Sequence, residues 1–247
     1  MCIIIIPFCE RLLIFLYRHF CAHIVGVYVC QLLCTHDVFV IYPPVCRMPS
    51  YKLYYFDFDG GAGEPIRNLF RLCKIPFEDI RVKHSDWPAI KGKAVFGQMP
   101  LLEIDGHMYA QSMALLRYLG KVTGMYPTDA ILALQVDELM DCMLDVRGKM
   151  STTYAMGEAE RMSTRIKLAE EFIKPRLADV EKRIANSVQT GGFAVGGKMT
   201  IADLVLANDV TGYMSGRLDG IEKTIADSHV NLLKVCTNVQ ETLHKKE

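Results

Sequence analysis

The chain has no excess of either charge, no internal repeat and no low-complexity segment. Its 247 residues include 28 basic and 28 acidic side chains, so the formal net charge is zero. A nucleic-acid-binding protein normally carries a basic excess, and its absence argues against that class. Intrinsic disorder is disfavoured because 51% of the residues are hydrophobic. The composition is that of a globular protein with a sizeable core, and the length suits one large domain or two small ones.

Cysteine is scarce beyond residue 47. Residues 1–47 contain six of the nine cysteines, which leaves only Cys73, Cys142 and Cys236 in the remainder. Three scattered cysteines form neither a disulfide framework nor a metal cluster. Residues 48–247 therefore have the composition of a reduced, intracellular protein. We expect a cytoplasmic location and no metal.

Residues 1–47 form a hydrophobic N-terminal extension that allows several interpretations. Glu10 and Arg11 interrupt its apolar run, and no clean small-residue cleavage site follows, which disfavours a signal peptide. The uncharged stretch 19–36 is at the short end for a membrane span. Met48 opens a sequence typical of a natural start. A spurious extension, a membrane anchor or targeting segment, and a buried addition all stay open, and membrane association is expected only if the segment is real and inserts.

Residues 48–124 carry the signals of a small mixed sheet with helices. A strand, a helix and a second strand follow at the spacing of a β-α-β unit, whose strands are parallel. A hairpin with the favoured Asp105-Gly106 turn comes next, followed by a helix for which Ser112 is a good N-cap. The predicted elements are the strand Lys52–Phe58, a helix with Glu64 and Pro65 in its first turn, the strand Phe77–Lys83, the strands Leu101–Ile104 and His107–Ala110, and a helix with Leu115, Leu116, Leu119 and Val122 that ends before Gly124.

The chain after a linker at 124–129 is predicted to be helical. A long amphipathic stretch, 158–188, contains Pro175, which we expect to kink or restart the helix. A glycine-rich loop at 189–197 precedes Thr200 and Asp203, whose spacing predicts a capping box. Two apolar stripes mark the other helices: Leu132, Val136, Leu139, Met140, Met143 and Leu144, then Leu232, Val235, Cys236, Val239 and Leu243.

Four short motifs occur in order along this part of the chain. They are Tyr54-Tyr55-Phe56 followed by Gly61-Ala62-Gly63-Glu64-Pro65-Ile66-Arg67, then Asp86-Trp87-Pro88-Ala89-Ile90-Lys91, then Gln98-Met99-Pro100-Leu101-Leu102, then Gln111-Ser112-Met113. Their order and spacing resemble cytosolic glutathione S-transferases, most closely the tyrosine-type sigma class. The resemblance covers residues 48–247.

The resemblance implies a fold, a co-substrate and an assembly. The fold is an α/β thioredoxin-like N-terminal domain (βαβ-ββα, mixed sheet) at 48–124, plus an all-α C-terminal domain at 130–247 on the acceptor-substrate side. Glutathione is the implied co-substrate, with no metal. The implied partners are a small hydrophobic electrophile and a second copy of the chain in a homodimer. The implied role is detoxification.

Tyr55 matches the catalytic tyrosine of the family. A thiol attacks electrophiles as the thiolate, and with a pKa of about 8.5 only a few per cent is ionised at neutral pH. The resemblance implies that Tyr55 donates its O–H to the sulfur and stabilises the thiolate. Tyr54, the neighbouring residue in the strand, should point to the opposite face of the sheet.

The resemblance also implies a set of glutathione-binding residues. A cis Pro100 would let the backbone of Met99 pair with the cysteinyl part of glutathione, as an added strand. The glycine end would contact Trp87 and Lys91. The start of the helix at Ser112, with Gln111 beside it, suits an anion such as the γ-glutamyl carboxylate. Phe56 and Gln98 of the same chain complete the set, together with Asp145 of the partner subunit.

The chain departs from the family pattern between Phe56 and Glu64. It carries one extra residue there, and the segment Asp59–Gly63 replaces the arginine that usually lies in this loop. In the sigma class that arginine helps to hold the tyrosine and the thiolate, so its absence implies weaker catalysis with the same fold. Conjugation of glutathione to hydrophobic electrophiles is the leading function, and the alternatives are a glutathione-dependent isomerase or peroxidase, or a catalytically weak glutathione-binding protein on the same scaffold.

Overall fold

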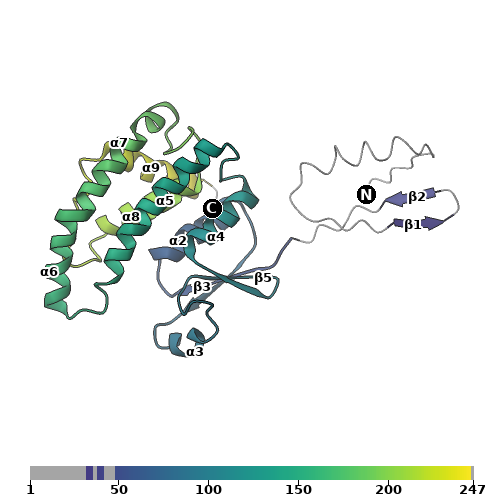
Figure 1. The fold of residues 1–247 in the computed structure, drawn as a ribbon, viewed down its shortest axis with the longest axis horizontal. Helices are drawn as coiled ribbons and strands as arrows, with labels where there is room; N and C mark the ends of the chain where they lie inside the picture. The colour runs from purple at the N-terminus through teal and green to yellow at the C-terminus, as the bar shows by residue number, and fades with distance from the viewer. Residues whose placement is uncertain (1–31, 36–37, 42–47, 246–247) are drawn as a thin grey trace. The chain divides into compact units, whose positions relative to one another are not determined.

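The computed structural model describes residues 32–35, 38–41 and 48–245 (Figure 1). The chain divides into two compact units, 1–49 and 50–247, and each is described by itself. In the first unit, β1 (Leu32–Thr35) pairs antiparallel with β2 (Val38–Ile41). Most of the extension, including nearly all of the candidate span 19–36, lies outside the described residues. Among those described, no helix is long and apolar enough to cross a membrane.

A mixed four-stranded sheet opens the second unit, in the order β4 (Glu78–Val82), β3 (Tyr51–Phe56), β5 (Leu101–Ile104) and β6 (His107–Ala110). As predicted, β3 and β4 are parallel and β5 and β6 form an antiparallel hairpin; β3 also pairs antiparallel with β5. The first strand ends at Phe56 and not at Phe58, because the Phe58 N–H turns back to the Phe56 carbonyl at 2.9 Å and strand pairing stops.

Helices follow β3, β4 and β6, and beyond Gly124 all regular secondary structure of the described residues is helical (Figure 1). The expected thioredoxin-like arrangement with a helical C-terminal part is therefore present. The short α3 was not predicted from the sequence. The helices are η2 (Gly61–Gly63), α2 (Glu64–Leu72), α3 (Trp87–Lys91), α4 (Ser112–Thr123), α5 (Ala130–Ser151), α6 (Glu158–Leu168), the π-helical η3 (Ala169–Ile173), α7 (Lys174–Gly191), α8 (Ile201–Met214) and α9 (Val230–His244).

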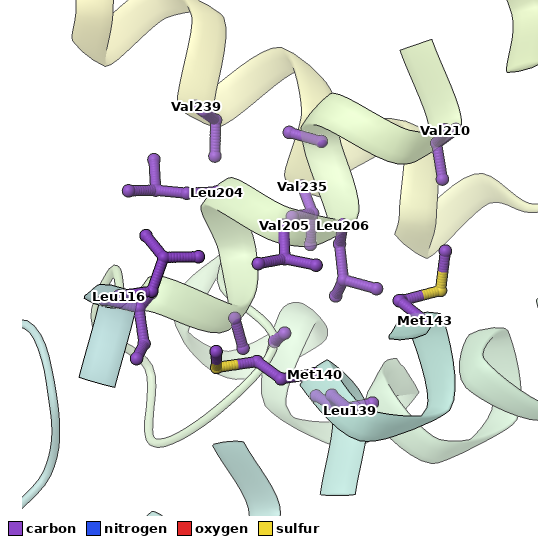
Figure 2. Close-up of a cluster of buried hydrophobic side chains, with 14 of the residues drawn as sticks. Leu116, Leu139, Met140, Met143, Leu204, Val205, Leu206, Val210, Val235 and Val239 are labelled. Atoms are coloured by element: carbon purple, nitrogen blue, oxygen red, sulfur yellow. The ribbon is translucent and has the colours of Figure 1, made fainter. Parts of the chain in front are cut away.

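One hydrophobic core runs from the sheet into the helical part. It begins at Tyr51 and Leu53 in β3 and continues through the helices to Val239. Figure 2 shows its centre, where α8 lies among α4, α5 and α9. The labelled side chains are Leu116, Leu139, Met140, Met143, Leu204, Val205, Leu206, Val210, Val235 and Val239. The helical part is therefore packed as one body with the sheet that carries Tyr55.

Several predictions about the helices need correction. The apolar stripes include Val122 and Leu144, but both side chains are exposed, because each lies just outside the arc of buried residues on its helix. Helix α7 continues to Gly191, so the glycine-rich loop is shorter than predicted. Pro175 does restart the helix: it lies in the first turn of α7, directly after the π-helical turn.

Candidate functional site

Tyr55 lies on the buried face of β3. The strand alternates strictly, so Tyr51, Leu53 and Tyr55 are buried, and Tyr54 belongs to the other face. Tyr54 donates its hydroxyl hydrogen to Glu103 at 3.0 Å. The opposite orientation predicted for the two tyrosines is thus confirmed.

The Tyr55 hydroxyl oxygen accepts a hydrogen bond from the Ala62 N–H at 3.0 Å. Among residues 48–245, no acceptor is recorded for the hydroxyl hydrogen itself. Burial raises the pKa of the Tyr55 phenol, while the Ala62 N–H and the charges of Arg147 and Arg67 act in the lowering direction. The phenol therefore keeps its hydrogen at neutral pH and remains a hydrogen-bond donor.

The loop between β3 and α2 closes tightly over this ring. Gly61 has a φ of 65°, which favours glycine, and a Cβ there would stand 2.5 Å from the Tyr55 hydroxyl. A Cβ at Gly63 would stand 2.5 Å from atoms of the Tyr55 ring. The glycines let the loop backbone reach the phenol, and sequence reasoning did not assign them this role.

Arg67 is a fully buried cation beside the same ring. Its Cζ lies 5.6 Å from the centroid of the Tyr55 ring. Its Nε donates to Asp79 at 3.0 Å, and its Nη1 donates to Glu64 and to the Phe58 carbonyl, each at 3.1 Å. The guanidinium is therefore held in one position, and its buried charge is balanced by the carboxylates of Asp79 and Glu64. The sequence showed Arg67 only as part of a motif, and nothing local indicated this burial.

A second buried cation belongs to the helical part. Arg147 of α5 donates to Asp209 of α8 through Nε at 2.9 and 2.8 Å and through Nη2 at 2.6 Å. Its Nη1 is buried without a partner in the described part of the chain, as is the Tyr213 hydroxyl. Coulombic interaction links Arg147 to both Tyr55 and Tyr213. Unpaired buried donors of this kind are suited to donate a hydrogen bond to a polar group of a bound molecule.

A third guanidinium approaches the loop from the far end of the chain. Arg217 donates from Nη1 to the Asp59 carbonyl at 2.8 Å. The loop lacks an arginine of its own, and the tertiary structure brings Arg217 to its exposed side. The contact spans 158 positions, so no local pattern in the sequence indicates it.

The peptide bond between Met99 and Pro100 is cis, as the resemblance implies. It directly precedes β5, with Gln98 exposed and Pro100 buried. Phe56 at the end of β3 stacks on His84 with 4.3 Å between ring centroids, and its ring centroid is 6.0 Å from that of Trp87. Phe56 and Trp87 are therefore neighbours.

The start of α4 differs by one residue from the prediction. Ser112 is the first helical residue and Gln111 is the cap, because the Gln111 carbonyl accepts the first intrahelical hydrogen bond, from Leu115 at 3.0 Å. Gln111 has a φ of 74°. Both residues still lie at the helix N-terminus, where free N–H groups and the helix dipole suit an anion.

The remaining predicted residues lie on the helical part. Asp145 is exposed on α5, and Asp141, one turn earlier, pairs with Arg117 at 2.6 Å. The capping box of Thr200 and Asp203 is present at the start of α8. Within residues 32–35, 38–41 and 48–245, no group of three or more His, Cys, Asp or Glu side chains is arranged to hold a metal ion.

Comparison with known proteins defines the class to which this fold and site belong. Residues 144–244 match the family described as "Glutathione S-transferase, C-terminal domain". "Glutathione S-transferase 1" of Ascaris suum is 34% identical over 198 residues, which are 78% of this chain and 92% of that protein.

Two solved structures resemble the chain over nearly their whole length. Prostaglandin synthase D of Nilaparvata lugens has a TM-score of 0.71 and 30% identity, covering 80% of this chain and 96% of its own. The monomeric Na-GST-3 of Necator americanus has a TM-score of 0.66 and 30% identity, covering 79% and 95%.

The chain belongs to the glutathione S-transferase family. It is a glutathione transferase, and members of this family use glutathione as co-substrate.

Proposed function

We propose that the Tyr55 hydroxyl donates a hydrogen bond to the sulfur of glutathione and stabilises the thiolate. The observation that carries this is the geometry of the hydroxyl: its oxygen accepts from Ala62, and its hydrogen remains available. A hydrogen bond to a charged group contributes about 1.5–3 kcal/mol. That energy lowers the thiol pKa by roughly one to two units, enough to raise the thiolate population strongly at neutral pH.

Glutathione is held by groups at the ends of three elements in this proposal. Trp87 and Lys91 of α3 bind the glycine end, with Phe56 supporting Trp87. The backbone of Met99, between Gln98 and Pro100, pairs with the cysteinyl part. The γ-glutamyl carboxylate binds at the N-terminus of α4, formed by Gln111 and Ser112. Asp145 of the partner subunit approaches the γ-glutamyl amine if the chain forms the expected homodimer.

The acceptor is proposed to be a small hydrophobic electrophile bound between the Tyr55 loop and the helical part. The sigma class, the cytoplasmic location and the detoxification role belong to the same proposal. A glutathione-dependent isomerase is the second candidate, because one structural relative is named a prostaglandin synthase. A glutathione-binding protein without turnover is the third.

Replacement of Tyr55 by Phe tests the proposal. The variant removes the donor and keeps the ring, so the thiol pKa of bound glutathione should rise by roughly one to two units. The pKa is measured from the ultraviolet absorbance of the thiolate, beside turnover of a chromogenic aryl halide. Retention of the wild-type protein on a glutathione column without turnover, unchanged in Tyr55→Phe, would instead support the binding protein.

A further inference from the structure

Two adjacent polar residues, Asn208 and Asp209, interrupt the apolar sequence of α8. The helix is otherwise almost entirely buried between Ile201 and Val210. Asn208 uses its side-chain amide for two contacts: Nδ2 donates to the Gly61 carbonyl at 3.1 Å and to Asp209 Oδ1 at 2.9 Å. The first contact spans 147 positions and joins the helical part to the loop over Tyr55.

The position of the Asn208 amide is fixed from the other side by an ion pair. Asp209 is held by Arg147 through three contacts of 2.6 to 2.9 Å, and the pair is largely buried. A multiply bonded Arg–carboxylate pair restricts both side chains to one geometry. Asn208 is thereby oriented with one amide hydrogen on Asp209 and the other on Gly61.

The group that Asn208 contacts is the same peptide unit that contacts Tyr55. The Gly61 carbonyl accepts from Asn208, and the Ala62 N–H across that peptide bond donates to the Tyr55 hydroxyl at 3.0 Å. A peptide unit is planar and rigid, so fixing its carbonyl also fixes the direction of its N–H. A hydrogen bond to the carbonyl also polarises the peptide and strengthens the donation from its N–H.

The other side-chain contacts of this loop within residues 48–245 are to its neighbouring groups: Arg67 donates to the Phe58 carbonyl, Arg217 to the Asp59 carbonyl, and the Gly60 N–H donates to Glu64. Gly60 and Gly61 have φ values of 110° and 65°, and glycine adopts other φ values at little cost. The side chain of Asn208 supplies a restraint that the loop sequence lacks.

We infer that Asn208 is a positioning residue for Tyr55, acting through the Gly61–Ala62 peptide unit and oriented by the Arg147–Asp209 ion pair. The inference rests on the function proposed above for the Tyr55 hydroxyl. Asn208 aligns and polarises the N–H that contacts the phenol, and so improves the phenol as a donor to the thiolate.

The chain offers a matched control for this contact. Asn238 of α9 donates from Nδ2 to the Gly192 carbonyl at 2.6 Å, in the loop after α7. It is also an asparagine that joins a helix to a glycine of positive φ. Within the described residues no contact joins this loop to Tyr55. Asn238→Ala therefore removes a similar hydrogen bond between a helix and a loop, without the proposed effect on the thiol pKa.

The experiment compares Asn208→Ala and Asn238→Ala in the full chain, each with Tyr55 and with Tyr55→Phe. We expect Asn208→Ala to raise the thiol pKa of bound glutathione by about one unit, equivalent to a roughly tenfold loss of thiolate below the pKa. The KM for glutathione should change less than about twofold, because the tripeptide contacts are elsewhere. In the Tyr55→Phe background Asn208→Ala should have no further effect on the thiol pKa.

Two results would overturn the inference while leaving the Tyr55 proposal intact. One is a thiol pKa that does not move in Asn208→Ala although it rises in Tyr55→Phe. The other is an equal rise in both backgrounds, which would show that Asn208 does not act through the hydroxyl. A thiol pKa unchanged in Tyr55→Phe itself would reject the function and the inference together. Asn208→Leu, which keeps the number and branching of the side-chain heavy atoms but removes the amide, replaces the alanine variant if that variant fails to fold.

Discussion

Two adjacent tyrosines have different chemistry because they face different surroundings. Tyr54 gives its hydrogen to Glu103, so its hydroxyl is occupied. Tyr55 receives a hydrogen bond from Ala62 and lies near two cations, Arg67 and Arg147. Burial raises the pKa of both phenols. The two phenols therefore differ in the direction of the hydrogen bond: Tyr54 donates and Tyr55 accepts.

Gly63→Ala tests how closely the loop must approach the Tyr55 ring. The added Cβ would stand 2.5 Å from ring atoms and 2.9 Å from the Tyr55 Cβ, so the ring or the loop must shift. We expect a loss of roughly 1–3 kcal/mol in the free energy of unfolding, as for other overpacked sites, together with lower kcat. Denaturant unfolding and steady-state kinetics measure the two effects.

Gly148→Ala is the control for this substitution. Gly148 lies in α5 with no heavy atom within 4 Å of an added Cβ, so alanine there should stabilise the protein by about 0.5–1 kcal/mol. A Gly63→Ala variant as stable and active as the wild type would contradict the close packing of the loop on Tyr55.

Helix α8 is a single element that joins the core to the candidate site, because it is buried in the core and its Asn208 contacts Gly61 in the loop over Tyr55. Its N-terminus is closed by Asp203, which accepts from the backbone N–H of Thr200 and of Ala194, both at 2.7 Å. The side chain is fully buried, and desolvation raises the pKa of the Asp203 carboxyl to about 6, against the lowering effect of these hydrogen bonds. The stability of this helix should therefore depend on pH.

The pH dependence of Asp203 has a definite sign. Its pKa is higher in the folded protein than the value of about 3.9 in an unfolded chain, so the folded state binds the proton more tightly. Its contribution to stability is complete below pH 4 and is lost as the pH rises to about 6. The change is at most about 3 kcal/mol, at about 1.4 kcal/mol per pKa unit.

Denaturant unfolding of the wild type and of Asp203→Asn between pH 4 and pH 7 isolates this contribution, because the variant cannot titrate at this position. The free energy of unfolding of the wild type should decrease relative to that of the variant across the window. A difference that is independent of pH would show that the carboxyl keeps its ordinary pKa.

The whole molecule is organised around one core that the sheet and the helical part share. Residues 50–247 form one compact unit, and the hydrophobic cluster runs from Tyr51 to Val239. The division into functional domains at 48–124 and 130–247 stays a prediction, as does the homodimer. A shared core favours cooperative unfolding of both parts.

A chain that begins at Met48 tests this organisation and the role of residues 1–47. We expect it to unfold in one transition and to bind a glutathione column as the full chain does, because the described site lies within residues 48–245. Calorimetry and column retention of the two chains side by side provide the measurement. Two separate transitions, or loss of retention on truncation, would show that the parts are independent or that the extension contributes to the site.

Most of the helices and strands, and several of their turns and caps, could be predicted from local patterns in the sequence. The Asp105-Gly106 turn, the capping box of Thr200 and Asp203 and the left-handed Gly124 after α4 are all present as predicted. Turns and caps depend on hydrogen bonds between near neighbours, so short spacings reveal them. The resemblance supplied the candidate role of Tyr55 and the cis state of Pro100, which periodicity alone does not indicate.

The surroundings of the Tyr55 hydroxyl depend on long-range packing that local patterns in the sequence do not indicate. The contact of Asn208 with Gly61, that of Arg217 with Asp59 and the burial of Arg67 beside the ring join parts of the chain that are distant or on different elements. No spacing rule connects such residues, because their approach depends on how α2 and α8 pack on the common core. The polar Asn208-Asp209 pair within the mostly apolar α8 is a feature of the sequence that could have indicated a buried polar contact.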